Sequence, residues 1–476
     1  MAERNRTAKT PTSTLAYVRD ARYERWRLQI FGVTWLVYAG FYFSRNAFSA
    51  AKVGILDDPS SSLTQAMLGN LDALYLAAYA AGQFFWGALA DRFGPRAVVT
   101  GGLLMSACAA LFMGLAPALI LFAPLMVVQG LAQSTGWASL CKNMASFFAV
   151  RERGRVLGLW STNYAFGGLV AAPFTGWWAY SVFDHWSAAF YAGAAVVLAA
   201  LLVFLVFQRN RPEDVGLPPI EEYRGSAAAQ AAPATPDSGP DAEPAGPAER
   251  APGAPATAVP RPRPAADDGP APPRPPGVRE ALATAVRNRM VLMLGLSYFL
   301  LKPARYAILL WGPVIVAQRT PEASNLEAVV IPVAFGAAGL AAPIVIGYVS
   351  DRWLGARRVP STVLSLGCLV VALVLFEPLT ASGSVPVMVA VLALIGLSVY
   401  AADTMISCTA AVDFGTSERA GSSAGFINGC GSIGAILGGL LPGYLGSDVL
   451  FYGFAAAALI SGLVLLPWWN RMPEAD

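Results

Sequence analysis

The chain has 476 residues, of which 55% are hydrophobic and only 13% are charged. An average soluble protein carries about 25% charged residues, so this composition excludes a soluble globular chain. The net charge of +3 is small and gives no support to nucleic-acid binding. The apolar residues gather in stretches of about twenty, which is long enough to cross a hydrocarbon core of roughly 30 Å. We therefore expect an all-α membrane protein.

Taken in chain order, these stretches predict twelve transmembrane helices arranged as two six-helix bundles. The first six are expected at 28–50, 66–88, 97–116, 118–146, 157–180 and 186–208. The second six are expected at 288–317, 327–350, 359–378, 384–412, 421–444 and 448–469. The two bundles would then occupy residues 28–209 and 287–470, with tails at 1–27 and 471–476.

The segment between the two bundles, residues 210–286, has a different composition. From Pro233 to Pro276 it contains fifteen prolines, interleaved with Ala, Gly, Asp and Glu. Such a stretch cannot bury enough apolar surface to fold. We expect a disordered linker that acts as a spacer between the bundles.

The basic residues indicate how the chain lies in the membrane. The loops on the side of the tails and the linker hold three clusters of arginines: Arg92 and Arg96; Arg151, Arg153 and Arg155; and Arg352, Arg357 and Arg358. The opposite loops carry few basic residues besides Lys52 and Arg319. Because cytoplasmic loops carry an excess of Lys and Arg, we expect a multi-pass bacterial inner-membrane protein with both termini in the cytoplasm. The N-terminal stretch lacks the features of a cleaved signal peptide.

The two halves repeat each other's motifs. Asp91-Arg92-Phe-Gly94 follows the second span, and Asp351-Arg352-Trp-Leu-Gly355 follows the eighth, at an offset of 351 − 91 = 260. Arg45 and Arg305 are separated by the same 260 residues, and so are Tyr38 and Tyr298. Six plus six helices related by a parallel repeat are typical of major facilitator transporters, whose substrate sites lie between the halves.

A second repeated motif opens the fifth and eleventh spans. Glu152-Arg153 in the first half corresponds to Glu418-Arg419 in the second, at an offset of 418 − 152 = 266. Charged turn residues of this kind can exchange ion pairs between open and closed states. We therefore expect a gating role for Asp91, Arg92, Asp351, Arg352, Glu152, Arg153, Glu418 and Arg419.

Arg45 and Arg305 lie inside predicted spans, where an ionisable residue costs at least roughly 2.5 kcal/mol and indicates a function. In the first span Tyr38, Tyr42 and Arg45 share one helical face, because their spacings of three, four and seven residues return to the same side. In the seventh span Tyr298, Lys302 and Arg305 repeat the pattern. The repeat would place the two arginines across the central axis from each other.

Two facing guanidinium groups repel each other in a low dielectric unless an anion lies between them. Arginine can grip phosphate oxygens with two parallel hydrogen bonds, so the pair predicts a phosphate site. The alternatives are that each arginine reaches the membrane interface or pairs with Asp72 or Asp403. Asp403 could instead balance Lys302 or take part in proton coupling. Further expected pocket residues are Gln83, Trp137, Tyr164 and Tyr400.

At these residues the chain resembles the organophosphate:phosphate antiporters of the major facilitator superfamily, which carry glycerol 3-phosphate or hexose phosphates. The resemblance covers both six-helix halves and is carried by 41–48 (FYFSRNAF), 304–313 (ARYAILLWGP), Gly136-Trp137 and Ala424-Gly425-Phe426. It implies that Arg45 and Arg305 hold the phosphoryl group. The chain departs from the family pattern where Tyr164 replaces a histidine, Gln83 a lysine and Lys302 a tyrosine.

The function that follows is exchange of a phosphorylated organic metabolite for inorganic phosphate by alternating access. One alternative keeps the fold but couples anion symport or export to protons through Asp403. Another is a membrane sensor that binds a sugar phosphate without transporting it. An enzyme is not expected, because no nucleophile–base constellation, metal-ligand cluster or phosphate-cradling glycine loop occurs. We expect no cofactor, a monomer in the lipid bilayer, and no nucleic-acid partner; the identity of the organophosphate stays open.

Overall fold

The computed structural model describes residues 20–115, 119–149, 156–157, 159–160, 162–223, 288–354, 357–410 and 420–470. Within these residues the chain is helical and contains no strand. Eight of the described helices are long and apolar enough to cross a membrane. The all-α fold predicted from the sequence is therefore confirmed.

In the part of the first half that the structure describes, there are six long or medium helices and one π-helical turn. Their bounds are α1 (Ala21–Asp57), α2 (Gln65–Leu115), α3 (Leu119–Ser134), α4 (Gly136–Phe147), α6 (Thr162–Trp177), η1 (Trp178–Val182) and α7 (Ser187–Phe207). α1 begins at an N-cap, because the carboxylate of Asp20 accepts a hydrogen bond from the backbone N–H of Arg22 at 2.8 Å. It therefore starts seven residues before the predicted span, and it ends seven residues after it.

One predicted span in this half differs from the structure. The fourth span, predicted at 118–146, is split at Thr135 into α3 and α4. Hydrophobicity alone cannot show this break, since both parts are apolar. The second and third predicted spans correspond to the two helical parts of α2, which are separated at Gly94, whose φ of 82° is a conformation that suits glycine.

The second half repeats this architecture. Its elements are α10 (Arg289–Arg319), α11 (Asn325–Val330), α12 (Val333–Arg352), α13 (Arg358–Thr380), α14 (Val385–Thr404), η3 (Met405–Ala410), α16 (Ala420–Leu440), η4 (Leu441–Gly443), α17 (Ser447–Leu465) and η5 (Leu466–Trp468). The predicted eighth span at 327–350 is two helices, because a turn at Ile331 and Pro332 separates α11 from α12.

The start of the predicted linker is ordered, which the composition argument did not anticipate. After α7 the chain forms η2 (Pro212–Val215) and a short helix at 220–223. The ring of Tyr223 stacks on that of Tyr23 at the start of α1, with a centroid distance of 3.9 Å. Leu217 and Ile220 complete a small buried cluster there. The proline-rich remainder, 224–286, lies outside the described residues.

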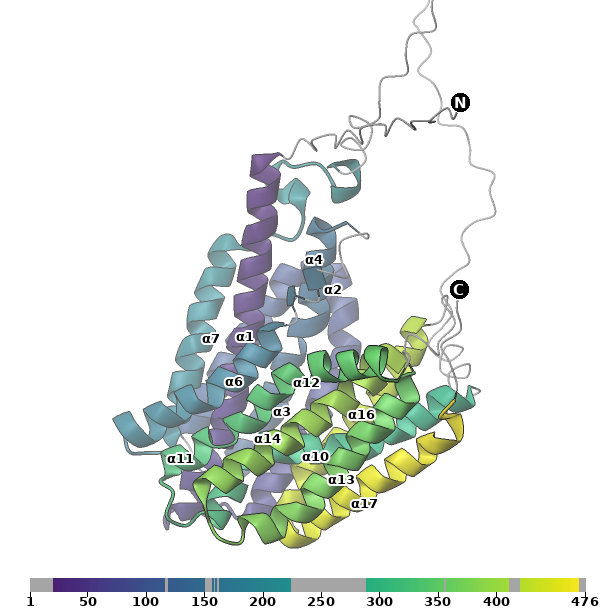
Figure 1. Ribbon diagram of the computed structural model, residues 1–476. Coiled ribbons are helices and arrows are strands. Elements are labelled where there is room, and N and C mark those ends of the chain that lie inside the picture. Colours follow the sequence, from purple (N-terminus) through teal and green to yellow (C-terminus); the bar gives the residue numbers. More distant parts are fainter. Residues whose placement is uncertain are drawn as a thin grey trace, which may run out of the picture.

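The two halves pack against each other at one end of the molecule. Figure 1 shows the helices of residues 20–223, coloured purple to teal, beside those of residues 288–470, coloured mainly green to yellow. One apolar core crosses between them and includes Phe48 and Leu68 of the first half with Trp311 and Val314 of the second. We call this the closed end; it carries the loops 58–64, 183–186, 320–324 and 444–446.

Polar contacts between the halves also lie at the closed end. The side chain of Gln65 donates to the carbonyl of Pro442 at 2.7 Å, and the hydroxyl of Tyr444 donates to Asn70 at 2.9 Å. Lys52, which the sequence suggested lies in a loop, is instead fully buried within α1. The reason is that α1 continues to Asp57 and that Lys52 finds a carboxylate partner, Asp72, inside the protein.

Candidate substrate site

A cavity of about 360 Å³ lies between the two halves. Arg45 of α1 and Arg305 of α10 both line it, so the structure brings the repeat-related arginines to one space. Four tyrosines and one acid are among the other lining residues: Tyr42, Tyr75, Tyr79, Tyr306 and Asp403. A cavity with apolar and aromatic walls and a few converging charges is the usual form of a small-molecule site.

Arg45 is oriented by neutral groups. Its Nε donates to Oε1 of Gln133 at 2.8 Å. Its guanidinium carbon lies 4.5 Å from the ring centroid of Tyr42 and 5.1 Å from that of Tyr79. The hydrogen bond to Gln133 uses Nε, so the two terminal nitrogens of Arg45 are available to a ligand in the cavity. Those terminal nitrogens form the edge that grips a carboxylate or a phosphate.

Gln133 of α3 is a site residue that the sequence analysis missed. It is completely buried. Its Oε1 accepts a second hydrogen bond from the hydroxyl of Tyr75 at 2.9 Å, and its Nε2 donates to the hydroxyl of Ser44 at 3.0 Å. The amide is therefore held on both sides and fixes the orientation of Arg45. Its signal in the sequence is a glutamine inside an apolar span, since polar residues within spans are often functional.

Arg305 is held by a carboxylate instead. Its Nη1 donates to Oδ2 of Asp403 at 2.9 Å, and its guanidinium carbon lies 4.4 Å from the ring centroid of Tyr400. The buried Nε of Arg305 has no hydrogen-bond partner in the described part of the chain. Arg305 therefore has donor capacity that its protein partners do not use.

Asp403 also forms an ion pair with Lys302, at 3.0 Å between Oδ1 and Nζ. The ammonium of Lys302 lies 4.4 Å from the ring centroid of Tyr298. Lys302 is buried and is not among the residues that line the cavity. The alternative in which Asp403 balances Lys302 is thus the arrangement that the structure shows, and Arg305 shares the same carboxylate.

The remaining predicted pocket residues fall into two groups. Tyr164 and Tyr400 line the cavity, as do Tyr42 and Asp403. Four others do not line it: Tyr38, Gln83, Trp137 and Tyr298. Tyr38 is buried against Trp137, with 5.3 Å between ring centroids. These two aromatic residues support the wall of the site, whereas Gln83 is exposed and is not among the lining residues.

The predicted gating residues are only partly described. Arg92 and Arg352 are exposed, and Arg92 lies 5.3 Å from the ring centroid of Phe93. Side-chain placement of Asp91 and Asp351 is not described, and Glu152, Arg153, Glu418 and Arg419 lie outside the described residues. In the described part of the chain no group of three metal-ligating side chains occurs.

Comparison with known proteins gives the family. The sequence profile of the Major Facilitator Superfamily matches residues 34–439 and, a second time, 333–476. The chain belongs to the Major Facilitator Superfamily. The fold is similar to that of a solved structure: a bacterial homologue of the human lysosomal transporter Spinster, in an inward-facing and unoccupied conformation, has a TM-score of 0.63. That match covers 94% of this chain and 96% of the other at 13% identity, and it concerns the fold alone.

Two curated relatives cover nearly the whole of this superfamily member. The chain is 27% identical to the glycerol-3-phosphate transporter of Bacillus subtilis, over 96% of this chain and 95% of the relative. It is also 27% identical to the membrane sensor protein UhpC of Salmonella typhimurium, over 98% of this chain and 97% of the relative. These matches confirm the resemblance to organophosphate:phosphate antiporters and place the chain among transporters rather than enzymes.

Proposed function

We propose that this protein exchanges a phosphorylated organic metabolite for inorganic phosphate across the bacterial inner membrane by alternating access. The observation that carries the proposal is the pair of repeat-related arginines, Arg45 and Arg305, on the walls of one cavity between the halves. The similarity to a glycerol-3-phosphate transporter supports the same substrate class.

The charges of the site fit a phosphate monoester. Arg45, Arg305 and Asp403 line the cavity, and the buried Lys302 pairs with Asp403, so three cations and one carboxylate leave a net charge of 3 − 1 = +2 in and beside the cavity. A phosphate monoester carries about −1.5 to −2 at pH 7. One bound phosphoryl group would therefore neutralise the site, and the organic part would contact the tyrosine-rich walls.

The same charges favour obligate exchange. When the empty carrier changes between its two states, its two arginines face each other with no anion between them. Their repulsion is unfavourable in a low dielectric. A bound phosphate removes this repulsion and draws the two halves together through both guanidinium groups. Exchange of one phosphate compound for another then avoids the empty, charged intermediate.

The expected orientation follows from the basic loops and from the closed end. With both termini in the cytoplasm, the closed end faces the periplasm, and the cavity lies on the cytoplasmic side of the contacts that close it. The charged turns at Asp91-Arg92 and Asp351-Arg352 would then lie on the cytoplasmic side and form the opposite gate. We expect the monomer to be sufficient for transport, because the cavity is built by one chain.

Counterflow in proteoliposomes tests the proposal. Purified protein is reconstituted into vesicles loaded with phosphate, and uptake of labelled phosphate is measured in the absence of a pH gradient. Exchange that requires internal phosphate supports the antiporter. Uptake that needs a pH gradient but no internal phosphate would favour the proton-coupled alternative. Binding of phosphate esters without any flux would favour a sensor, a function that the similarity to UhpC makes the second candidate.

The organic part of the substrate can be sought on the same protein. A thermal-shift screen with phosphate, sugar phosphates, phosphoglycerates and phosphonates identifies ligands, because a ligand that binds only the folded state stabilises it in proportion to RT ln(1 + [L]/Kd). The site charge of +2 predicts that esters with an uncharged organic part stabilise the protein more than phosphoglycerates do. The reverse ranking would contradict the charge argument.

A further inference from the structure

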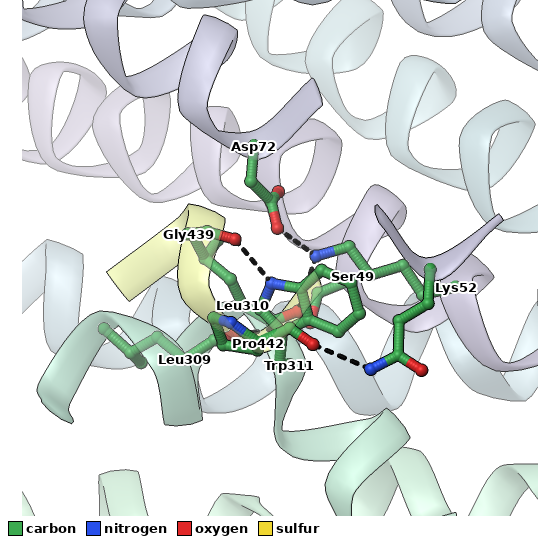
Figure 2. A network of polar contacts seen from close by, with 9 residues as sticks. Ser49, Lys52, Asp72, Leu309, Leu310, Trp311, Gly439 and Pro442 are labelled. Carbon is green, nitrogen blue, oxygen red and sulfur yellow. Dashed lines mark hydrogen bonds and ion pairs between the residues drawn. The ribbon is translucent and has the colours of Figure 1, made fainter. Parts of the chain in front are cut away.

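A second charged cluster, Lys52 and Asp72, lies at the closed end, beside Ser49, Leu309 and Leu310, which line the cavity of the proposed phosphate site. Lys52 of α1 forms an ion pair with Asp72 of α2, and their side chains are 0% and 1% exposed. Figure 2 shows this pair and the groups around it. Burying two charges is unfavourable unless further hydrogen bonds satisfy them. The groups that contact this ion pair therefore indicate its role.

The partner of Lys52 outside its own half is a backbone carbonyl. Nζ of Lys52 donates to the carbonyl of Leu310 in α10 at 2.9 Å, and the hydroxyl of Ser49 donates to the same oxygen at 2.9 Å. Ser49 also lies 3.3 Å from the carbonyl oxygen of Leu309. Pro313 has no N–H and so leaves that carbonyl, four residues earlier, without its helical partner. The proline thus leaves the carbonyl of Leu309 open to Ser49, while the carbonyl of Leu310 accepts the two shorter bonds.

Trp311 covers the cluster from the second half. Its Nε1 donates to the carbonyl of Gly439 in α16 at 2.9 Å, and the ammonium of Lys52 lies 4.2 Å from its ring centroid. A methyl group on Gly439 would lie 3.0 Å from Cβ of Asp72, so the two halves touch there. Figure 2 shows Gly439, Trp311 and Asp72 around the ammonium of Lys52.

The internal repeat shows that the ion pair belongs to one half only. The 260-residue offset relates Lys52 to 52 + 260 = 312 and Asp72 to 72 + 260 = 332, which are Gly312 and Pro332. These two are also neighbours, since a Cβ on Gly312 would lie 2.9 Å from Cβ of Pro332. The first half therefore has an ion pair where the second has an apolar contact. Ser49 is related to position 309 (49 + 260), whose carbonyl it contacts.

We propose that Lys52, Asp72 and Ser49 form a latch that holds the closed end together and opens once in each transport cycle. Because the ion pair lies within one half, its charges stay compensated when the halves separate. Opening then breaks hydrogen bonds to the carbonyls of 309 and 310 and does not separate opposite charges. A contact of this kind is strong enough to bias the closed state and weak enough to open repeatedly.

The latch lies on the same two helices as the substrate arginines. Ser49 follows Arg45 by four residues on α1, and Leu309 follows Arg305 by four residues on α10, about one helical turn in each case. Phosphate that draws the arginines together would therefore act on the helices that carry the latch. This part of the inference rests on the proposed function, whereas the latch itself can be tested without substrate.

Distance measurements by pulsed electron spin resonance test the latch directly. Spin labels are placed at Ser62→Cys and Glu322→Cys, which are exposed loop positions of the two halves at the closed end, in a chain whose native cysteines are replaced. Removing a hydrogen bond usually changes an equilibrium by about two- to tenfold. We expect S49A to lower the ratio of closed to open molecules about threefold, and K52M/D72L to lower it about tenfold.

The double variant removes both charges together, because Lys52→Met alone would leave Asp72 buried without a partner. Tyr180→Phe is the matched control: its hydroxyl donates to the carbonyl of Ala50 at 2.7 Å, a bond to α1 that stays within the first half. It should leave the distance distribution unchanged. If S49A and K52M/D72L both keep the wild-type distribution, the latch is wrong, whatever the result of phosphate exchange. If the double variant does not fold, S49A alone decides.

Discussion

The two arginines of the proposed phosphate site, Arg45 and Arg305, occupy equivalent positions in the repeat but have different surroundings. Arg45 is oriented by a neutral amide, Gln133, and by tyrosine rings. Arg305 is bound by Asp403, which also pairs with Lys302. Each half thus has an arginine at the equivalent position, but different side chains orient the two arginines.

This difference indicates an order of events when an anion binds. The terminal nitrogens of Arg45 can donate to a phosphate without losing the bond to Gln133, because that bond uses Nε. Arg305 must instead share or exchange its bond to Asp403. Phosphate should therefore contact Arg45 first and then compete with Asp403 for Arg305. Substitutions can distinguish the half-site of Arg45, which is oriented by Gln133 and ready for phosphate, from the half-site of Arg305, where Asp403 competes with phosphate.

The largest effect is expected from Arg45→Lys and Arg305→Lys. Lysine keeps the charge but cannot form two parallel hydrogen bonds. The loss of one charge-assisted hydrogen bond, roughly 1.5–3 kcal/mol, corresponds to a decrease in phosphate exchange of about 10- to 100-fold. Labelled phosphate counterflow measures the decrease, and the level of folded protein is checked by size-exclusion chromatography. Near-normal exchange in either variant would exclude the bidentate role of that arginine.

The next largest effect is expected from Gln133, the neutral partner of Arg45. Gln133→Leu removes the acceptor of Arg45 Nε and leaves the hydroxyls of Tyr75 and Ser44 without this partner. An unsatisfied buried group costs roughly 1–3 kcal/mol, so phosphate affinity should fall about tenfold. Isothermal titration with phosphate measures the affinity. Gln133→Glu serves as the companion variant: it keeps an acceptor for Arg45 but introduces an anion that competes with phosphate, so it should also weaken binding.

In the half-site of Arg305, a substitution is expected to strengthen phosphate binding. Asp403→Asn removes the competing carboxylate from Arg305 and raises the site charge to +3, so phosphate should bind about fivefold more tightly, as for roughly 1 kcal/mol. The same titration measures it. Asp403→Asn combined with Lys302→Met restores a charge of +2 and should return the affinity toward the wild-type value. Weaker phosphate binding in Asp403→Asn would show that Asp403 orients Arg305 and does not compete with the ligand.

Much of this site could be predicted from the sequence, because its charges stand out against apolar spans. Arg45, Arg305 and Asp403 are rare residue types for such positions, and the 260-residue repeat relates the two arginines. Of the three residues that the helical periodicity placed on one face, Tyr42 and Arg45 line the cavity, whereas Tyr38 is buried against Trp137. The all-α fold followed from hydrophobicity for the same reason.

Other features depend on three-dimensional contacts that a single sequence does not encode locally. Gln133 lies in a different helix from Arg45, and nothing in its neighbourhood of the sequence marks it as a partner. Lys52 was placed in a loop because hydrophobicity falls near a charge, although its counterion, Asp72, keeps it inside α1. The first part of the linker is ordered because aromatic stacking on Tyr23 outweighs its polar composition.

The smallest expected effects are changes in thermal stability from polar contacts at the closed end, one in each half. In the second half Arg319 pairs with Glu377, and the hydroxyl of Ser447 lies 2.6 Å from Nη2 of Arg319. In the first half the partly buried carboxylate of Asp58 accepts hydrogen bonds from Nε1 of Trp186 at 3.0 Å and from the Ser60 backbone at 2.9 Å. Glu377→Gln should lower the midpoint of thermal unfolding by a few degrees, for roughly 1 kcal/mol.

Asp58→Asn should lower that midpoint less than Glu377→Gln does, because Asp58 is only partly buried and its bonds compete with water. The hydrogen bond from Trp186, followed by those from Ser60, lowers the pKa of Asp58 to about 2, against about 3.9 in an unfolded chain. A depressed pKa stabilises the folded state above about pH 4, and this contribution disappears as the pH falls toward 2. The difference between wild type and Asp58→Asn should therefore be present at pH 7 and shrink below pH 4. A difference that is independent of pH would assign the contact to packing of Trp186 and not to the ionised carboxylate.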